Sequence, residues 1–286
     1  MALTSDHTML GIIAGKGTLP LSVAQAAVAA GRPVFVLGIR GTSEPSIEKY
    51  NHAWVRSGAI GKTLALLKQQ KCHELVLIGP MERPNIFNFW PDLGALRLLP
   101  DIFKLLRQGD DGLLSGVVEY FEEVHGFRIL PAEEIAGGLV APVGISSTRK
   151  PSEADMKDVS LAVEIVRERG AQDLGQGAIV AHEEVLAVED AAGTDAMLRR
   201  TTASRQGEEQ CGVLVKLPKP GQERRVDLPT IGIKTLENAA VAGLAGIAYE
   251  ANGALFVDFV KTVARANELG LFILGLPEGT GEGTNV

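Results

Sequence analysis

Short apolar runs alternate with helical patterns through the first third of the chain. Each run ends at or just before a glycine, which is typical of buried strands in an α/β protein. Strands separated by single helices predict βαβ units and a parallel sheet. We therefore expect a Rossmann-like α/β domain with a parallel sheet over residues 1–131. The expected strands are residues 9–14, 33–38, 74–79 and 127–130, and the expected helices are residues 19–30, 61–70, 101–108 and 113–123.

The pattern changes at residues 132–151, where prolines and glycines cluster without a clear period, and we expect a linker there. Ser152 then precedes acidic residues and a helical pattern that runs to residue 169, as at a capped helix start. Residues 152–276 mix short apolar runs with helical stretches, which predicts a mixed α/β catalytic domain. The Gly-rich, polar residues 277–286 are expected to form a disordered tail.

Composition narrows the class of partner. The 286 residues are 45% hydrophobic and 22% charged, so the chain can form extensive cores. A formal net charge of −7 and an aromatic content of 5% argue against nucleic acid as the main partner. The N-terminus lacks the features of a signal peptide, and the longest small-apolar run, residues 239–249, is shorter than the about 20 residues of a membrane span. We expect a cytoplasmic protein.

A glycine-rich turn follows the first expected strand. Backbone N–H groups at such a strand-to-helix turn can bind a phosphate. The turn is not a Walker A loop, and Pro20 stands where the third glycine of a dinucleotide-binding fingerprint belongs. Substrate binding is expected here, with a tight turn as the alternative. The turn consists of Gly15, Lys16, Gly17 and Thr18.

A segment broken by prolines and glycines, residues 216–232, places cations near one carboxylate. Lys216 and Lys219 can neutralise a pyrophosphate, and Asp227 can bind a metal ion or position a water. Lys216 lies in an apolar run, so the alternative is a lysine that extends from a strand edge into solvent. Asp227 lies between Val226 and Leu228, where a buried carboxylate is costly without a partner or a function. We therefore expect Asp227, Lys216 and Lys219 to be catalytic.

A second acidic cluster lies upstream. Glu189 offers an oxygen for Mg²⁺, which prefers one or two carboxylates together with substrate phosphate and water. The alternative for Glu189 is a solvated strand end. Gly193, Thr194 and Asp195 open an expected helix whose N-terminus can bind substrate, and the alternative for Asp195 is charge pairing at the helix start. Asp227 and Glu189 are thus the expected metal ligands.

Five segments together resemble the LpxI family. The combination of Glu-x-x-x-Gly-Thr-Asp at residues 189–195 and Asp-Leu-Pro-Thr-Ile-Gly at residues 227–232 is the most specific part, and it adds Thr230 to the expected substrate-binding residues. The resemblance covers nearly the whole chain, through residue 274. The segments are residues 11–20, 175–180, 188–195, 216–220 and 227–232.

The resemblance implies a two-domain pyrophosphatase of lipid A biosynthesis that holds its ligand between the domains. It implies Mg²⁺-dependent hydrolysis of UDP-2,3-diacylglucosamine to UMP and the acylated sugar 1-phosphate, lipid X, with water attacking the phosphorus that bears the sugar. A lipid nucleotide of this kind also implies transient peripheral contact with the inner membrane surface. Residues 236–249 are a candidate lining for the acyl chains, with ordinary core as the alternative. The sequence is compatible with a homodimer.

Two rival functions follow from the same residues. A Rossmann-type oxidoreductase needs an acidic residue at the end of the second strand to bind ribose, and Arg40 lies there instead. A non-catalytic nucleotide-sugar-binding protein would bind the UDP-sugar without releasing UMP.

Overall fold

The computed structural model describes residues 8–81, 109–204 and 210–280, which form two compact units. The first unit takes the chain through Gly137 together with Arg225–Asp227. The second unit takes Gly138–Arg224 and the chain from Leu228 onward. The predicted α/β class is confirmed, with a parallel sheet in the first unit and a mixed sheet in the second.

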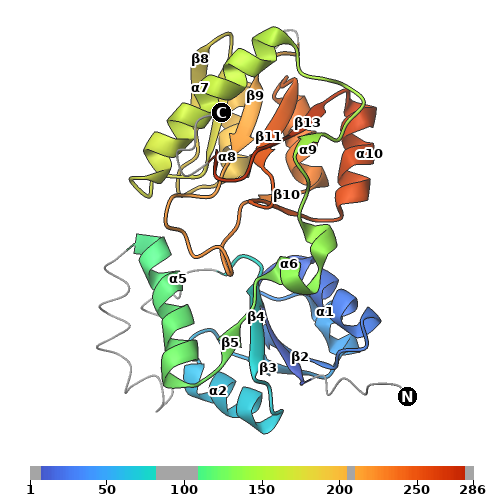
Figure 1. Ribbon diagram of the computed structural model, residues 1–286, viewed down its shortest axis with the longest axis vertical. Coiled ribbons are helices and arrows are strands. Elements are labelled where there is room, and N and C mark those ends of the chain that lie inside the picture. Colours follow the sequence, from blue (N-terminus) through green and yellow to red (C-terminus); the bar gives the residue numbers. More distant parts are fainter. Residues whose placement is uncertain (1–7, 82–108, 205–209, 281–286) are drawn as a thin grey trace. The chain divides into compact units, whose positions relative to one another are not determined.

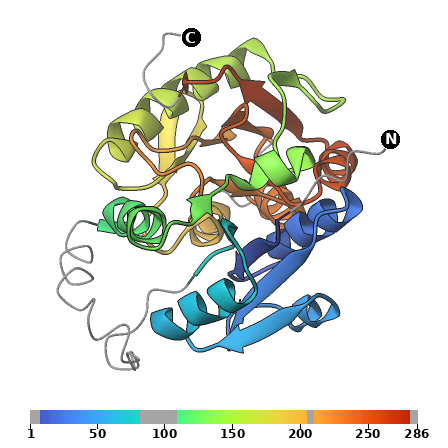
Figure 2. The same ribbon diagram turned by 60° about the horizontal axis from the view of Figure 1, so that its bottom comes forward.

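The first unit is a five-stranded parallel sheet with helices on both faces (Figures 1 and 2). Its strand order is β3-β2-β1-β4-β5, and every pairing is parallel. On one face, Ile13 and Leu75 pack in a core with α2 and α5. On the other face, α1 contacts β1 and β2 and also meets α6. The central strands are apolar runs because both of their faces are buried.

The elements of the first unit begin and end as follows. They are β1 (Leu10–Ala14), α1 (Leu19–Ala29), β2 (Val34–Ile39), the 3₁₀ turn η1 (Pro45–Lys49), β3 (His52–Val55), α2 (Ile60–Gln69), β4 (Glu74–Ile78), α5 (Gly109–Glu119), the π-helical turn η2 (Tyr120–Val124), β5 (Arg128–Ile129), α6 (Ala132–Ile135) and the 3₁₀ turn η3 (Gly137–Leu139), which crosses into the second unit.

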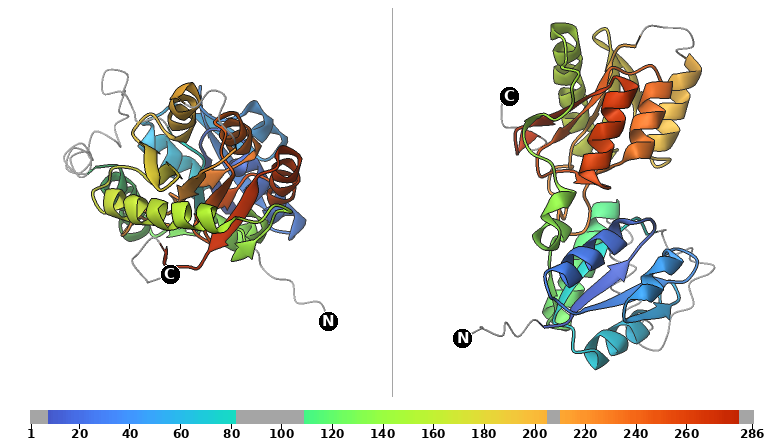
Figure 3. Two further views of the ribbon diagram at one scale, coloured as in Figure 1. Left: turned by 90° about the horizontal axis from the view of Figure 1, so that it is seen from above. Right: turned by 90° about the vertical axis from the view of Figure 1, so that its right-hand side faces the viewer.

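The second unit is a six-stranded sheet with helices on both faces (Figure 3, right). Its strand order is β6-β13-β11-β9-β7-β8; β9, β11 and β13 are parallel, and β6, β7 and β8 pair antiparallel. Val159 and Val163 of α7 pack on one face, and Met197, Leu236 and Ala266 bring α8, α9 and α10 to the other. Ser152 caps α7 through a capping box with Asp155, as predicted.

The elements of the second unit follow in chain order. They are β6 (Gly144–Ile145), α7 (Glu153–Gly170), β7 (Gly177–Ala181), β8 (Glu184–Val188), α8 (Thr194–Ser204), β9 (Val213–Lys216), β10 (Thr230–Ile231), α9 (Ile233–Val241), β11 (Gly246–Glu250), β12 (Leu255–Phe256), α10 (Phe259–Leu269) and β13 (Phe272–Leu276); β10 and β12 form a separate parallel pair.

Two segments differ from their predicted character. Residues 132–151, predicted as a linker, contain α6 and also β6, which pairs with β13 in the main sheet. Of the predicted disordered tail, Thr280 is buried, and its Oγ1 donates to the carbonyl of Pro277 at 2.6 Å. The expected helix over residues 101–108 lies outside the described residues. Within the described parts of the chain, no helix combines the length and the apolar character that crossing a bilayer requires.

Candidate functional site

A buried carboxylate and a buried ammonium lie together in the second unit. Lys216 ends β9, and its Nζ donates to Thr194 Oγ1 at 2.6 Å. Thr194 in turn donates to Glu189 Oε1, which lies 3.9 Å from Lys216 Nζ. The side chains of Lys216 and Glu189 are only 4% and 8% exposed. The alternatives of a solvated strand end and a lysine reaching solvent are therefore wrong.

Gly177 leaves space for the carboxylate of Glu189. Gly177 is the register partner of Lys216 across β7 and β9, and its carbonyl accepts from Glu189 N at 2.8 Å. A Cβ on Gly177 would lie 2.9 Å from Glu189 Oε2, so any larger residue would crowd the carboxylate. Oε2 is buried and has no hydrogen-bond partner among the described residues. A buried acceptor in this state needs a donor or a cation.

These residues fit a magnesium ion only as part of a larger set of ligands. The described residues contain no group of three or more His, Cys, Asp or Glu side chains that could hold a metal ion. Glu189 Oε2 is one suitable oxygen, although the charge of Lys216 beside it offsets part of the carboxylate's attraction for a cation. Asp227, the other predicted ligand, belongs to the first unit and is half-buried rather than buried. Substrate phosphate and water would have to supply the remaining ligands.

Asp195 is held in an ion pair at the start of α8. Its Oδ2 lies 2.7 Å from Lys234 Nζ, and its Oδ1 accepts from Asn238 Nδ2 at 2.9 Å, so α8 is tied to α9. Burial alone would raise the pKa of the Asp195 carboxyl. The hydrogen bonds from Lys234 and Asn238, with the charges of Lys234 and Arg199, outweigh burial and hold that pKa below its ordinary value. Gly193 precedes the helix with a φ of 80°, in the left-handed region.

Asp195→Asn should lower the melting temperature near neutral pH, and its difference from wild type should shrink in acid. Because the folded-state pKa lies below the ordinary value of about 3.9, the stabilisation is complete above that value and is lost as pH falls through the folded-state pKa. Thermal unfolding across a pH series checks this, with the exposed Glu184→Gln as the control. A destabilisation that stayed constant down to strongly acidic pH would contradict the assignment.

The remaining predicted residues of the second unit, Lys219 and Thr230, lie away from Glu189 in the sequence. Lys219 Nζ lies 2.5 Å from Asp173 Oδ1, so this lysine already has a carboxylate partner. Thr230 opens β10, is half-buried, and is paired in register with Leu255 of β12. Both lysines that were predicted to neutralise phosphate are thus paired with acidic side chains in this structure.

The glycine turn of the first unit lies at the carboxyl end of β1, beside the end of β4. Gly15 N donates to Ile78 O, and Lys16 N donates to Pro80 O, both at 2.8 Å. These two N–H groups are therefore used by the neighbouring backbone, and a phosphate here would depend on Gly17 and Thr18. Gly17 has a φ of 85°, and Thr18 precedes α1 without a side-chain cap.

Gly15→Ala should destabilise the first unit by about 1–3 kcal/mol, the usual range for overpacking. A Cβ at Gly15 would lie 2.1 Å from the carbonyl oxygen of Gly79, which is backbone and cannot rotate away. Urea unfolding without ligand measures the effect. Gly137→Ala is the matched control because no atom lies within 4 Å of its Cβ position. Equal stability of the two variants would contradict the prediction.

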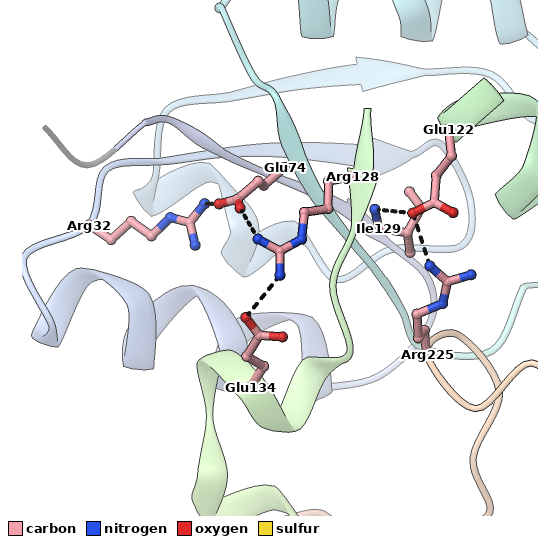
Figure 4. Close-up of polar contacts among 7 residues, drawn as sticks. All are labelled: Arg32, Glu74, Glu122, Arg128, Ile129, Glu134 and Arg225. Carbon is pink, nitrogen blue, oxygen red and sulfur yellow. Dashed lines mark hydrogen bonds and ion pairs between the residues drawn. The ribbon is translucent and has the colours of Figure 1, made fainter. Parts of the chain in front are cut away.

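Sequence reasoning missed two arginine–carboxylate pairs. Arg224 and Arg225 were not among the predicted site residues, yet Arg224 Nη1 lies 3.0 Å from Glu250 Oε1 and Arg225 Nη1 donates to Glu122 Oε1 at 2.9 Å. Glu250 is completely buried at the end of β11. Figure 4 shows Glu122 with Arg225 and, beside them, a separate network around Glu74. The two adjacent arginines were the only sequence feature that could have pointed to these two ion pairs.

Comparison with known proteins supplies the family. The family model for the LpxI N-terminal domain matches residues 9–139, and that for the LpxI C-terminal domain matches residues 142–274. The chain belongs to the LpxI family. A curated relative, the UDP-2,3-diacylglucosamine pyrophosphatase LpxI of Caulobacter vibrioides, is 43% identical over 272 residues, which cover 93% of this chain and 97% of that protein. The resemblance inferred from the motifs is confirmed.

The predicted site residues come from both LpxI domains. Gly15 to Thr18 lie in the LpxI N-terminal domain, whereas Glu189, Thr194 and Lys216 lie in the LpxI C-terminal domain. Arg225–Asp227 form an exception, because the LpxI C-terminal domain includes them in sequence while they pack with the first unit. Asp227 is therefore carried by the first unit, although the rest of its motif belongs to the second.

Proposed function

We propose that this protein hydrolyses the pyrophosphate bond of UDP-2,3-diacylglucosamine, a step of lipid A biosynthesis, and releases UMP and 2,3-diacylglucosamine 1-phosphate. The observation that carries the proposal is the 43% identity to a pyrophosphatase of that name, which extends over 97% of the relative's length. Because both LpxI domains match, the whole of the catalytic machinery is expected to be present.

Mg²⁺ is the proposed cofactor; when bound, it neutralises charge on the non-bridging oxygens of the pyrophosphate. Asp227 is the proposed ligand or water-positioning group, because it is the acid of the Asp-Leu-Pro-Thr-Ile-Gly motif. Glu189 Oε2, a buried acceptor without a partner among the described residues, supports Glu189 as a further ligand. The ligand set itself is a proposal.

Lys216 and Lys219 are both paired with carboxylates, so their proposed roles differ from direct phosphate binding. Lys216 is bound to Thr194 and Glu189, so we propose that it orients this carboxylate and the first turn of α8. The N-terminus of an 11-residue helix favours an anion, which supports Gly193 and Thr194 as substrate-binding residues. Asp195 keeps its predicted substrate-binding role as part of the proposal, although its carboxylate pairs with Lys234. Lys219 can contact phosphate only by leaving or sharing Asp173. Thr230 and residues 15–18 keep their predicted substrate-binding roles as part of this proposal.

Two acyl chains on the substrate lead us to propose transient contact with the cytoplasmic surface of the inner membrane. Such contact would let the protein take a lipid nucleotide from a bilayer without crossing it. Flotation with vesicles that contain the substrate, compared with vesicles that lack it, tests this part separately from turnover.

One experiment tests the reaction. Purified protein is incubated with UDP-2,3-diacylglucosamine in water enriched in heavy oxygen, with Mg²⁺ and with Mg²⁺ plus chelator. We expect UMP release only without chelator, and we expect the label in the sugar 1-phosphate because attack occurs at the sugar-bearing phosphorus. Label in UMP would place attack on the other phosphorus. Tight substrate binding without UMP release would favour a nucleotide-sugar-binding protein instead.

A further inference from the structure

The boundary between the two units passes between two adjacent arginines. Arg224 belongs to the second unit and lies 3.0 Å from the completely buried carboxylate of Glu250. Arg225 belongs to the first unit and donates to Glu122 Oε1 at 2.9 Å. Each arginine is therefore bound to a carboxylate of its own unit, and the chain is held on both sides of the peptide bond that joins them.

Glu122 connects three segments of the first unit (Figure 4). It lies in the π-helical turn η2, a rare element that is often found at functional sites. Its Oε1 accepts from Arg225 and also from Ile129 N of β5, at 2.9 Å. The residue that follows Arg225, Val226, packs against the apolar core that α5 and the parallel sheet share.

We propose that Arg225 and Glu122 are positioning residues that hold Asp227 on the first unit for hydrolysis. Asp227 follows Arg225 by two residues, so their Cα atoms lie within about 7 Å of each other at full extension. The ion pair and the packing of Val226 therefore limit where the Asp227 carboxylate can be. This inference rests on the proposed function, which gives Asp227 its role.

The expected effect is on turnover more than on folding. The side chains of Arg225 and Glu122 are 33% and 29% exposed, and ion pairs at this exposure contribute little to stability. Turnover is more sensitive, because a misplacement of about 1 Å of a reacting group can cost up to about a hundredfold in rate. Removing Glu122 should therefore lower kcat. Because Ile129 N also loses its acceptor, a modest loss of stability accompanies it, and kcat is compared at a temperature where both variants are folded.

The test compares Glu122→Ala with Glu123→Ala, its exposed neighbour on the same turn. With UDP-2,3-diacylglucosamine and Mg²⁺, we expect Glu122→Ala to lower kcat about tenfold or more and to change KM less than about twofold. Glu123→Ala should behave like the wild type. Arg225→Lys, which keeps the charge, should retain more turnover than Arg225→Met. A wild-type kcat for Glu122→Ala would overturn the proposal, as would equal losses in the two alanine variants.

A second readout does not depend on turnover. Limited trypsin digestion should cut after Arg224 and Arg225 faster in Glu122→Ala than in Glu123→Ala, because the segment would detach from the first unit. If the wild-type protein released no UMP, the proposed function would fail, and the digestion would then decide the anchoring alone. Equal cleavage of the two alanine variants would disprove that anchoring.

Discussion

Asp227→Ala should reduce UMP release by about a thousandfold or more while substrate binding survives. A carboxylate that holds a metal or a water acts mainly in the transition state, and its loss costs several kcal/mol, at about 1.36 kcal/mol per tenfold in rate. Asp227 is half-buried and is carried by a three-residue segment of the first unit, so truncation leaves no large cavity. We therefore expect a folded protein whose defect lies in kcat.

The measurement for Asp227 combines steady-state turnover with calorimetric binding of the substrate. Asp190→Ala is the matched control, because Asp190 is an exposed acid with an arginine partner, Arg200, at 3.0 Å. Asp227→Asn separates charge from shape and should be nearly as inactive as Asp227→Ala. Near-wild-type turnover by Asp227→Ala would remove this residue from the mechanism.

Local patterns were sufficient for most of the fold. Apolar runs that end at glycine predicted β1, β2 and β4, and the Ser152 cap predicted the start of α7. β11 was missed, because residues 236–249 were considered only as an acyl-chain lining or as core. Gly243, with a φ of 71°, follows the end of α9 and allows the chain to turn into a central strand. Leu236, Ala239, Leu244 and Tyr249 of this run are buried in the core, while Val241 is exposed, so the structure supports the core reading over an acyl-chain lining.

The sequence singled out charged residues for the candidate site but not their pairings. Lys216 was conspicuous as a lysine in an apolar run, and the structure shows it to be buried, where a cation requires an anionic partner. The partner is Glu189, 27 positions earlier, and only the antiparallel register that pairs Gly177 with Lys216 brings the two together. The docking of Arg225 on Glu122 joins residues 103 positions apart, so no local pattern contains it. Long-range pairing decides which charged groups stay available for substrate.

The second large effect is expected for Lys216→Met. This substitution should lower the free energy of unfolding by about 3 kcal/mol or more. The substitution keeps the length of the apolar stem and removes the ammonium beside a carboxylate that is 8% exposed. Breaking one side of a buried ion pair typically costs about 3–5 kcal/mol because the remaining charge is left uncompensated. Thr194 still donates to Glu189 Oε1, which places the expectation at the lower end of that range.

The double variant Glu189→Gln with Lys216→Met separates the structural role from phosphate binding. If Lys216 mainly compensates Glu189, adding Glu189→Gln should recover most of the lost stability, because no buried charge remains. Urea unfolding without ligand measures this cycle, and substrate affinity is measured on the same variants. If Lys216 instead served phosphate alone, Lys216→Met would weaken binding and leave unfolding unchanged. The 2.6 Å bond to Thr194 and the burial of both charges favour the first outcome, since a lysine with no internal role would extend to solvent.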